Sequence, residues 1–341
     1  MPPRLAPPTP PPGSPVHTHG RLKVRNHQLI GTHGRPVRLR GLSTHGLHWF
    51  GPDTFLRPHR LRELSTHWHA DVLRLAVYPD EGGYLTHPAR LDPVIHQLIG
   101  DTARLGLYCI VDWHILTPGN PLLRLDAARD FFERLAAMHR RHPHLLFELC
   151  NEPNGPDANW DCLREYAGKL IPAIRRYDRD RILLMGTPGW SSCGAAIPPT
   201  PPNPPANPSG PDELLRRPLA GSLAHNLLYT FHFYAASHTG HHRRVFERVA
   251  SQLPVFVSEW GMNRATGHGP PDRRSTRLWL GLLDRFNTSW VYWNLSNELS
   301  ACAVFKRDTP PDAPFDPRWL KPAGRQLHHL LAPTRAGQPP S

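Results

Sequence analysis

Two glutamates follow short apolar segments at positions where they could act together. Glu152 follows the apolar run of LLFELCNEPNG (145–155), and Glu259 follows that of VFVSEWG (255–261). Pro153 restricts Glu152 to extended backbone, so the acid stays at the end of its predicted strand. In a barrel of parallel strands, the carboxyl ends of the strands form the catalytic face. Two carboxyl groups there meet the requirement of glycoside hydrolysis, although either glutamate alone could be a solvent-facing loop residue.

Further polar and aromatic residues collect at the predicted ends of the other strands. They are Arg74, Asp112, His114, Asn151, His232, Tyr234 and Trp293. Each has a structural alternative, since an arginine can form a surface ion pair and histidine or tryptophan can belong to the core. Their shared placement at one end of the strands favours a site. Glu148 lies inside its strand, so we expect it to be paired structurally rather than to be catalytic, and we expect Asp112 to support its neighbours.

Strand and helix patterns alternate along the chain. We expect strands at 37–42, 72–77, 107–112, 145–149, 182–185, 227–232, 255–259 and 290–293. We expect helices at 57–67, 90–105, 126–141, 160–177, 242–252, 273–286 and 317–331. Eight strands with intervening helices predict an α/β protein with a (β/α)8 TIM barrel, formed by one domain over residues 19–335.

Three segments lie outside this alternation. Residues 1–18 are proline-rich and predict an extended or disordered arm. Residues 22–30 alternate in polarity and predict a short β-hairpin that turns at Asn26-His27 and closes the bottom of the barrel. Residues 195–211 form a proline-rich insertion after the fifth strand, either a wall of the substrate cleft or a tolerated surface insertion. We favour the surface insertion, because long loops cost little closure entropy.

Composition limits the remaining possibilities. The 341 residues carry a formal charge of +12, and because 4 of the 40 basic residues are lysines, 36 are arginines. These arginines are spread through the chain without a nucleic-acid motif, so we expect no nucleic-acid partner. No apolar run reaches the roughly 20 residues of a membrane span, and the N-terminus lacks the apolar core of a secretory signal. The five cysteines include no CxxC pair, and the histidines lack matching ligands, so neither a disulfide framework nor a metal site is indicated.

The motifs together resemble glycoside hydrolase family 5, and within it the bacterial endo-β-1,4-glucanases, or cellulases. The resemblance covers about residues 20–300 in order and rests on RGLSTHGLHWF (40–50), LRLAVYPDEGGY (73–84), IVDWHILTPGNP (110–121), LLFELCNEPNG, LYTFHFYAASH (228–238), VFVSEWG and SWVYWNLS (289–296). It implies a retaining enzyme with Glu152 as acid/base and Glu259 as nucleophile. Arg74, His114, Asn151, His232, Tyr234 and Trp293 would surround the cleaved sugar. His45, Trp49 and Tyr78 would contact the glycone side and Trp190 the leaving-group side.

Several expectations follow from this resemblance. A retaining mechanism needs the carboxyl groups of Glu152 and Glu259 about 5 to 5.5 Å apart. Arg74 and Tyr234 would favour the ionised form of Glu259, whereas apolar neighbours would favour neutral Glu152. Relatives have a cis peptide bond at the position of Trp293-Asn294. We expect no cofactor, a monomer, and secretion, since the substrate would be a polymeric β-glucan.

The resemblance leaves the exact substrate open. Relatives often carry a lysine where this chain has Glu298, and the insertion and the tail after Ala301 also differ from them. The alternatives are the same chemistry on mannan, xyloglucan or mixed-linkage glucan, and a non-catalytic glycan-binding protein that kept the fold. The presence of both glutamates argues against the last.

Overall fold

The protein folds as a closed barrel of eight parallel strands. The computed structural model describes residues 7–196 and 210–332. The strands follow one another around the barrel in chain order, with the last beside the first. They are β3 (Arg40–Thr44), β4 (Val72–Val77), β5 (Tyr108–Trp113), β6 (Leu145–Glu148), β7 (Ile182–Met185), β8 (Leu227–Tyr234), β9 (Val255–Gly261) and β10 (Trp290–Leu295). The predicted (β/α)8 barrel is therefore confirmed.

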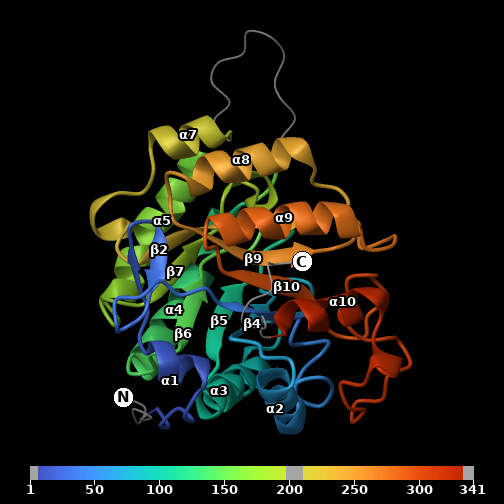
Figure 1. Ribbon diagram of the computed structural model, residues 1–341. Helices are drawn as coiled ribbons and strands as arrows, with labels where there is room; N and C mark the ends of the chain where they lie inside the picture. The colour runs from blue at the N-terminus through green and yellow to red at the C-terminus, as the bar shows by residue number, and fades with distance from the viewer. Residues whose placement is uncertain (1–6, 197–209, 333–341) are drawn as a thin grey trace.

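Helices form an outer layer around the barrel (Figure 1). The main ones are α2 (Pro58–Thr66), α3 (Pro88–Leu105), α4 (Leu125–His139), α5 (Trp160–Arg175), α8 (Gly240–Ala250), α9 (Arg273–Arg285) and α10 (Pro322–Leu331). Local sequence sets several of their ends. Asn159 accepts a hydrogen bond from the backbone N–H of Cys162 at the start of α5, and Gly106 ends α3 with a positive φ of 68°. In the described part of the chain, no helix is long and apolar enough to cross a membrane.

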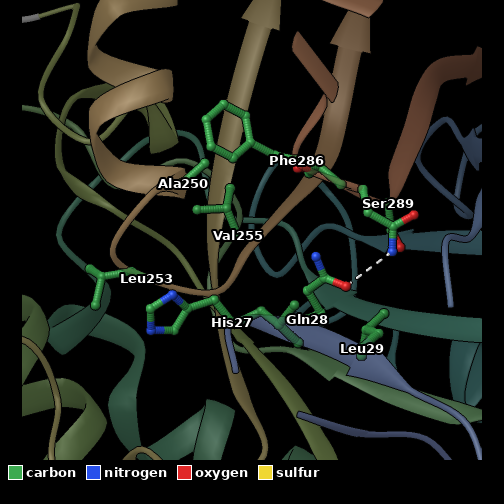
Figure 2. Close-up of a pocket in the computed structure, with 11 residues that line it drawn as sticks. His27, Gln28, Leu29, Ala250, Leu253, Val255, Phe286 and Ser289 are labelled. Atoms are coloured by element: carbon green, nitrogen blue, oxygen red, sulfur yellow. Dashed lines mark hydrogen bonds between the residues drawn. The ribbon is translucent and has the colours of Figure 1, made fainter. Parts of the chain in front are cut away.

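The predicted hairpin is confirmed and lies at the bottom of the barrel. It consists of β1 (Lys23–Arg25) and β2 (Gln28–Ile30), and Asn26 and His27 turn with positive φ. Leu22 and Leu29 join the apolar cluster formed by the lower ends of the strands. Figure 2 shows the hairpin beside Val255, Phe286 and Ser289 around a cavity of about 10 Å³. This volume holds about one water molecule, so the cavity is too small for a sugar.

Two predicted elements begin at least three residues too early. The first barrel strand starts at Arg40 rather than at residue 37, because the chain before it pairs with other partners. Pro36 bridges Ile30 of the hairpin, and the backbone N–H of Leu39 donates to the Ser289 hydroxyl (2.9 Å). The terminal helix starts at Pro322 rather than at residue 317, since the chain is extended at Leu320. Proline is well suited to the first helical position.

Short helices that the sequence did not predict form within the arm and on either side of the insertion. Ser14 caps α1 (Pro15–His19), and Val16 of this helix is buried in the lower cluster, so the expectation of an extended arm is wrong at its end. Between β7 and β8 the chain forms α6 (Pro188–Ser191) and α7 (Pro211–Arg216). Most of the predicted insertion at 195–211 lies outside the described residues.

The segment after β10 packs against α2. The guanidinium of Arg60 in α2 is buried and donates to the carbonyls of Pro310 (3.0 Å) and Pro311 (2.8 Å). It also lies 4.9 to 5.6 Å from the ring centres of Phe55, Phe305 and Phe315. This arginine therefore ties the tail of the chain to the barrel through hydrogen bonds and cation–π contacts.

Candidate active site

The predicted polar residues meet at the carboxyl ends of the barrel strands. Arg74 lies on β4, His114 follows β5, Asn151 and Glu152 follow β6, and the remaining ones, His232, Tyr234, Glu259 and Trp293, lie near the ends of β8, β9 and β10. All except Glu152 and Tyr234 are buried, and those two are partly buried. The barrel thus brings together residues that are up to 219 positions apart, the interval from Arg74 to Trp293.

Glu259 is held by two donors from different strands. The Tyr234 hydroxyl donates to its Oε1 at 2.6 Å, and Nη1 of Arg74 donates to its Oε2 at 3.3 Å. Arg74 is completely buried, and its side chain also contacts Glu148 (2.6 Å) and Asp112 (3.0 Å). Burial alone would lower the pKa of Arg74, but the three carboxylates outweigh that effect and raise it. Arg74 is therefore a permanent cation at the centre of the site.

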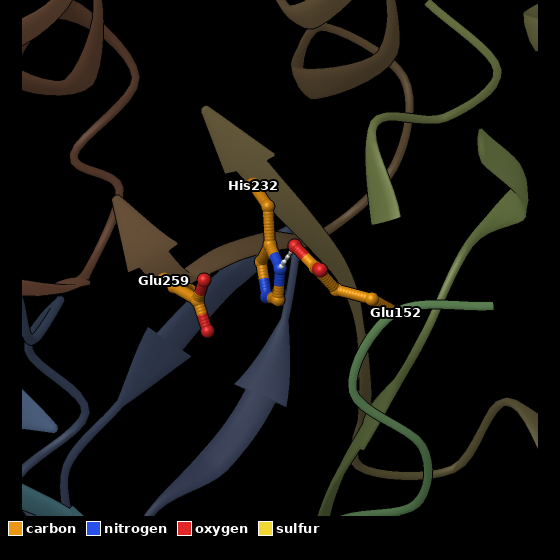
Figure 3. Close-up of side chains that lie close together, drawn as sticks. All are labelled: Glu152, His232 and Glu259. Carbon is orange, nitrogen blue, oxygen red and sulfur yellow. Dashed lines mark hydrogen bonds and ion pairs between the residues drawn. The ribbon is translucent and has the colours of Figure 1, made fainter. Parts of the chain in front are cut away.

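Glu152 has a different partner. Its Oε1 lies 2.9 Å from Nδ1 of His232, and its side chain remains 12% exposed. Figure 3 shows the imidazole ring between the carboxyl groups of Glu152 and Glu259. An oxygen of each carboxyl lies within 4.8 Å of the other. The two acids therefore face one region but depend on separate hydrogen-bond partners.

Asn151 and His114 form a third arm of the network. Oδ1 of Asn151 accepts from Nη2 of Arg74 (2.7 Å), and its Nδ2 donates to the Ile115 carbonyl and lies 3.3 Å from Nε2 of His114. Nδ1 of His114 lies 2.6 Å from Asp112. Burial, and then the charge of Arg74, lower the pKa of His114 well below its usual value. The ring is therefore neutral, with its proton on Nδ1 toward the carboxylate and Nε2 as the acceptor.

Aromatic side chains form a wall beside this network. The ring of Trp293 stacks on His114 at a centroid distance of 5.1 Å and lies 5.2 Å from His45. His45 in turn lies 5.4 Å from Trp49 and 6.1 Å from Tyr78. Trp49 is 46% exposed, whereas Tyr78 is buried. The peptide bond between Trp293 and Asn294 is cis, as expected from the resemblance.

Trp190 stands apart from this wall. It belongs to α6, is 46% exposed, and has a left-handed backbone conformation with φ of 60°. Its backbone N–H donates to the carbonyl of Pro153 at 2.9 Å, which places it beside the loop that carries Glu152. Eleven of the twelve predicted site residues thus form one contact network, and Trp190 joins it only through this backbone bond.

The electrostatics of Glu259 differ from the expectation. Burial is the largest cause that raises its pKa, and the charge of Glu152 adds to this effect. His232, Arg74 and the Tyr234 hydrogen bond act in the opposite direction, and the pKa remains at about 7. The predicted directions for Arg74 and Tyr234 are correct, but burial and the second carboxylate outweigh them. Such a proton belongs to the pair of acids rather than to one of them.

Glu152, His232 and Glu259 are also the group most suited to hold a metal ion in the described part of the chain, since one donor atom of each lies within 4.8 Å of the others. Both ring nitrogens of His232 already have partners, however: Glu152 at Nδ1 and the Ser258 hydroxyl at Nε2, each at 2.9 Å. A metal would have to break one of these bonds, so the donor set fits proton transfer better than metal binding.

Comparison with known proteins supplies the family. The description "Cellulase (glycosyl hydrolase family 5)" matches residues 30–299. The chain belongs to glycoside hydrolase family 5. Endoglucanase E-5 of Thermobifida fusca is 38% identical over 320 residues, which cover 94% of this chain and 65% of that protein. Endoglucanase MaCel5A of Microbulbifer sp. (strain ALW1) is 37% identical, over 87% of this chain and 55% of that protein.

Solved structures agree with this family assignment. The catalytic domain of the Thermobifida fusca endoglucanase Cel5A superposes with a TM-score of 0.86 at 38% identity, covering 94% of this chain and 99% of that domain. A variant of that domain in complex with cellotetraose gives a TM-score of 0.85. The chain thus spans the catalytic domain but only about 55 to 65% of the length of the two full relatives above.

Sequence reasoning missed two members of the site. Ser43 of β3 accepts a hydrogen bond from Nη1 of Arg74 at 3.3 Å, and Ser258 of β9 lies between His232 and Glu148. Both serines are completely buried. A serine within an otherwise apolar strand must find a hydrogen-bond partner. The position of each serine within its strand therefore indicated that it takes part in a buried hydrogen bond. It could not identify the partners, which are 31 and 26 or more positions away.

Proposed function

We propose that this chain is a secreted, monomeric endo-β-1,4-glucanase that cleaves internal bonds of cellulose or a related β-glucan with retention of configuration. The main support is the proximity of Glu152 and Glu259, whose nearest oxygens lie within 4.8 Å. Retaining enzymes separate their carboxyl groups by about 5 to 5.5 Å, whereas inverting enzymes need about 6.5 to 9.5 Å to hold a water between them. The geometry therefore favours double displacement.

In the first step, Glu259 attacks the anomeric carbon while Glu152 protonates the glycosidic oxygen. A bond forms between C1 and a Glu259 oxygen, the bond from C1 to the leaving oxygen breaks, and the proton leaves with the aglycone. Arg74 and Tyr234 orient Glu259 for attack through their hydrogen bonds. In the second step, water attacks C1, gives its proton to Glu152 and releases Glu259.

The aromatic wall supports a chain of glucose units as the substrate. Trp293 offers an apolar face to the sugar in the cleaved position, and His45, Trp49 and Tyr78 extend this wall to the glycone side. Trp190 lies beside the Glu152 loop and suits the leaving-group side. The cellotetraose bound to a structural relative agrees with a β-glucan substrate. Mannan, xyloglucan and mixed-linkage glucan remain the alternatives to be compared in a panel of polysaccharides.

Two alanine variants test the separate roles. Glu152→Ala should accumulate glycosyl-enzyme from dinitrophenyl cellobioside, giving a burst of dinitrophenol, because this leaving group needs no acid. Added azide should attack the intermediate and release β-cellobiosyl azide. In Glu259→Ala, azide can only replace the missing carboxylate and attack the substrate directly, which gives the α-azide.

The stereochemistry of the azide products decides between the assignments. Exchanged products would reverse the roles of the two glutamates. Near-normal hydrolysis of cellulose by both variants would place the reaction elsewhere. A wild-type protein that binds cello-oligosaccharides but releases no reducing sugar from any polysaccharide would instead be a glycan-binding protein.

A further inference from the structure

Glu148 is a buried carboxylate beneath the reaction site that the mechanism above does not use. It lies on β6, four residues before Glu152, and has no exposed surface. Its Oε2 accepts from Nε of Arg74, and its Oε1 accepts from the Ser258 hydroxyl, each at 2.6 Å. Burial alone would raise the pKa of Glu148, but Arg74 and His232 outweigh it and the net change is downward. Glu148 therefore stays ionised and can only accept hydrogen bonds.

This fixed anion determines the direction of the next hydrogen bond. A serine hydroxyl has a single proton, and that of Ser258 is donated to Glu148. Toward Nε2 of His232, 2.9 Å away, the Ser258 oxygen can therefore only accept. It follows that Nε2 of His232 carries a proton.

We propose that Glu148 and Ser258 are positioning residues that fix one proton on Nε2 of His232, so that a second proton is shared between Nδ1 of His232 and Glu152. This inference rests on the proposed role of Glu152 as acid. In the first step the shared proton moves to the leaving oxygen as the bond to C1 breaks, and in the second step the attacking water returns it. The Nε2 proton is not consumed.

The opposite orientation would disable the acid. If Ser258 donated to Nε2, a neutral His232 would carry its proton on Nδ1 and direct it at Glu152. Glu152 would then have to accept, as an ionised carboxylate, and would have no proton to give. The direction of two buried hydrogen bonds thus selects the working form of the acid.

The charges around His232 support the same arrangement. Burial alone would lower the pKa of His232, but Glu148, whose Oε1 lies 3.7 Å from Nε2, and the hydrogen-bonded Glu152 outweigh burial and raise the pKa to about 9. The other groups that face it are Glu259 from β9, Asp112 and His114 from β5, Arg74 through Glu148, and His238 after β8. The nearest anions therefore retain the shared proton through neutral pH.

Two variants test this chain of bonds from its two ends. Ser258→Ala removes the acceptor for Nε2–H. Glu148→Gln keeps its oxygen for Arg74 but presents an amide N–H to Ser258, which turns the hydroxyl toward His232. Both should lower kcat/KM about 100-fold or more for aryl cellobiosides with poor leaving groups, and less than about fivefold for dinitrophenyl cellobioside. Both should also move the alkaline limb of the pH profile down by about 1 unit or more.

Two controls separate positioning from general damage. Ser258→Thr keeps the hydroxyl and should restore most of the activity on poor leaving groups. Asp112→Asn also removes a buried carboxylate from Arg74, but Asp112 contacts His114 rather than His232. Asp112→Asn should therefore lower kcat/KM by a similar factor for substrates with poor leaving groups and for dinitrophenyl cellobioside. A uniform loss in Ser258→Ala, or an unchanged dependence on the leaving group, would overturn the proposal.

A measurement on the unaltered protein covers the case in which the variants do not fold. The ¹⁵N resonances of His232 should show Nε2 protonated at neutral pH, and a ring protonated only on Nδ1 would overturn the proposal. Glu152→Ala distinguishes this inference from the proposed function. If that variant lacks a steep dependence on the leaving group, the acid itself is misassigned. If it shows that dependence and Ser258→Ala does not, only the role of Glu148 and Ser258 is wrong.

Discussion

Replacing Glu259 with glutamine should stabilise the protein at alkaline pH while it abolishes activity. Glu259 is 4% exposed, and its pKa rises from 4.5 to about 7 mainly because of burial and the nearby Glu152. At about 1.36 kcal/mol per pKa unit, ionising this group costs the folded protein roughly 3 kcal/mol. Glutamine resembles the neutral acid in shape and avoids that cost.

The pH dependence follows from the sign of this change. Between pH 4.5 and about 7, the pair formed by Glu259 and Glu152 holds a proton in the folded protein that the unfolded chain has released. The free energy of unfolding contributed by this group is therefore fully present below pH 4.5 and is lost as pH rises to about 7. Glutamine does not titrate, so its advantage should appear over the same interval.

One lost hydrogen bond reduces the expected gain. The glutamine oxygen can accept from Arg74, but its amide then faces the Tyr234 hydroxyl, which loses its acceptor. This costs about 1 kcal/mol. The net gain in the free energy of unfolding should be about 2 kcal/mol at pH 8, with a small loss of about 1 kcal/mol at pH 4.5.

Urea unfolding of both proteins at half-unit steps from pH 4.5 to 8 measures this difference. Glu165→Gln is a matched control, because Glu165 is about half exposed and pairs with the equally exposed Lys169. It should change the free energy of unfolding by less than about 0.5 kcal/mol at every pH. A difference for Glu259→Gln that is independent of pH, or that has the opposite slope, would refute the reasoning. Such a result would show that Arg74 and Tyr234 offset the burial of Glu259.

Three further changes test other parts of the protein. Trp49→Ala removes an exposed face of the aromatic wall, so it should raise KM for cellotetraose about tenfold and leave kcat nearly unchanged, as initial rates would show. Replacing residues 195–211 with a short Gly/Ser linker should leave turnover of an aryl cellobioside nearly unchanged, and a hundredfold drop would show that this segment shapes the site. Arg60→Ala should lower the free energy of unfolding by about 2 to 4 kcal/mol in urea titrations, because it leaves the tail and three phenylalanine rings without their cation, whereas the exposed Arg62→Ala on the same helix should have little effect.

The sequence predicted the elements that have strong local patterns. The strands β4 and β7 begin and end at residues 72–77 and 182–185 as predicted, since a barrel strand is covered on both faces and appears as an apolar run, which in β4 is interrupted by Arg74. The start of β3 was wrong because Val37 and Leu39 are equally apolar, yet they pack with the hairpin at the bottom of the barrel. An apolar pattern shows that a residue is buried and does not show which neighbour buries it.

The same limit applies to the site. Glu152 and Glu259 stand out in the sequence because each follows an apolar strand, and the expectation that Glu148 is paired is confirmed by its contact with Arg74. The pKa of Glu259 was not foreseen, because it depends on how deeply the barrel buries the carboxyl and how near it brings Glu152. These are long-range distances, and no local pattern encodes them.

Ser258 shows how much one such distance determines. It adjoins Glu259 in sequence, yet its hydroxyl lies between Glu148 of β6 and His232 of β8. Ser258 therefore contacts His232, the partner of Glu152. Neighbouring residues of β9 therefore have different roles in the proposed mechanism, where Glu259 is the nucleophile and Ser258 supports the acid/base Glu152. Glu148 also binds Arg74, and Arg74 binds Glu259. The same buried carboxylate therefore contacts Arg74, which binds Glu259, and Ser258, which binds the partner of Glu152. Glu148→Ala, which removes both contacts, should therefore also weaken nucleophilic attack by Glu259, whereas Glu148→Gln and changes at Ser258 should affect mainly proton transfer through Glu152.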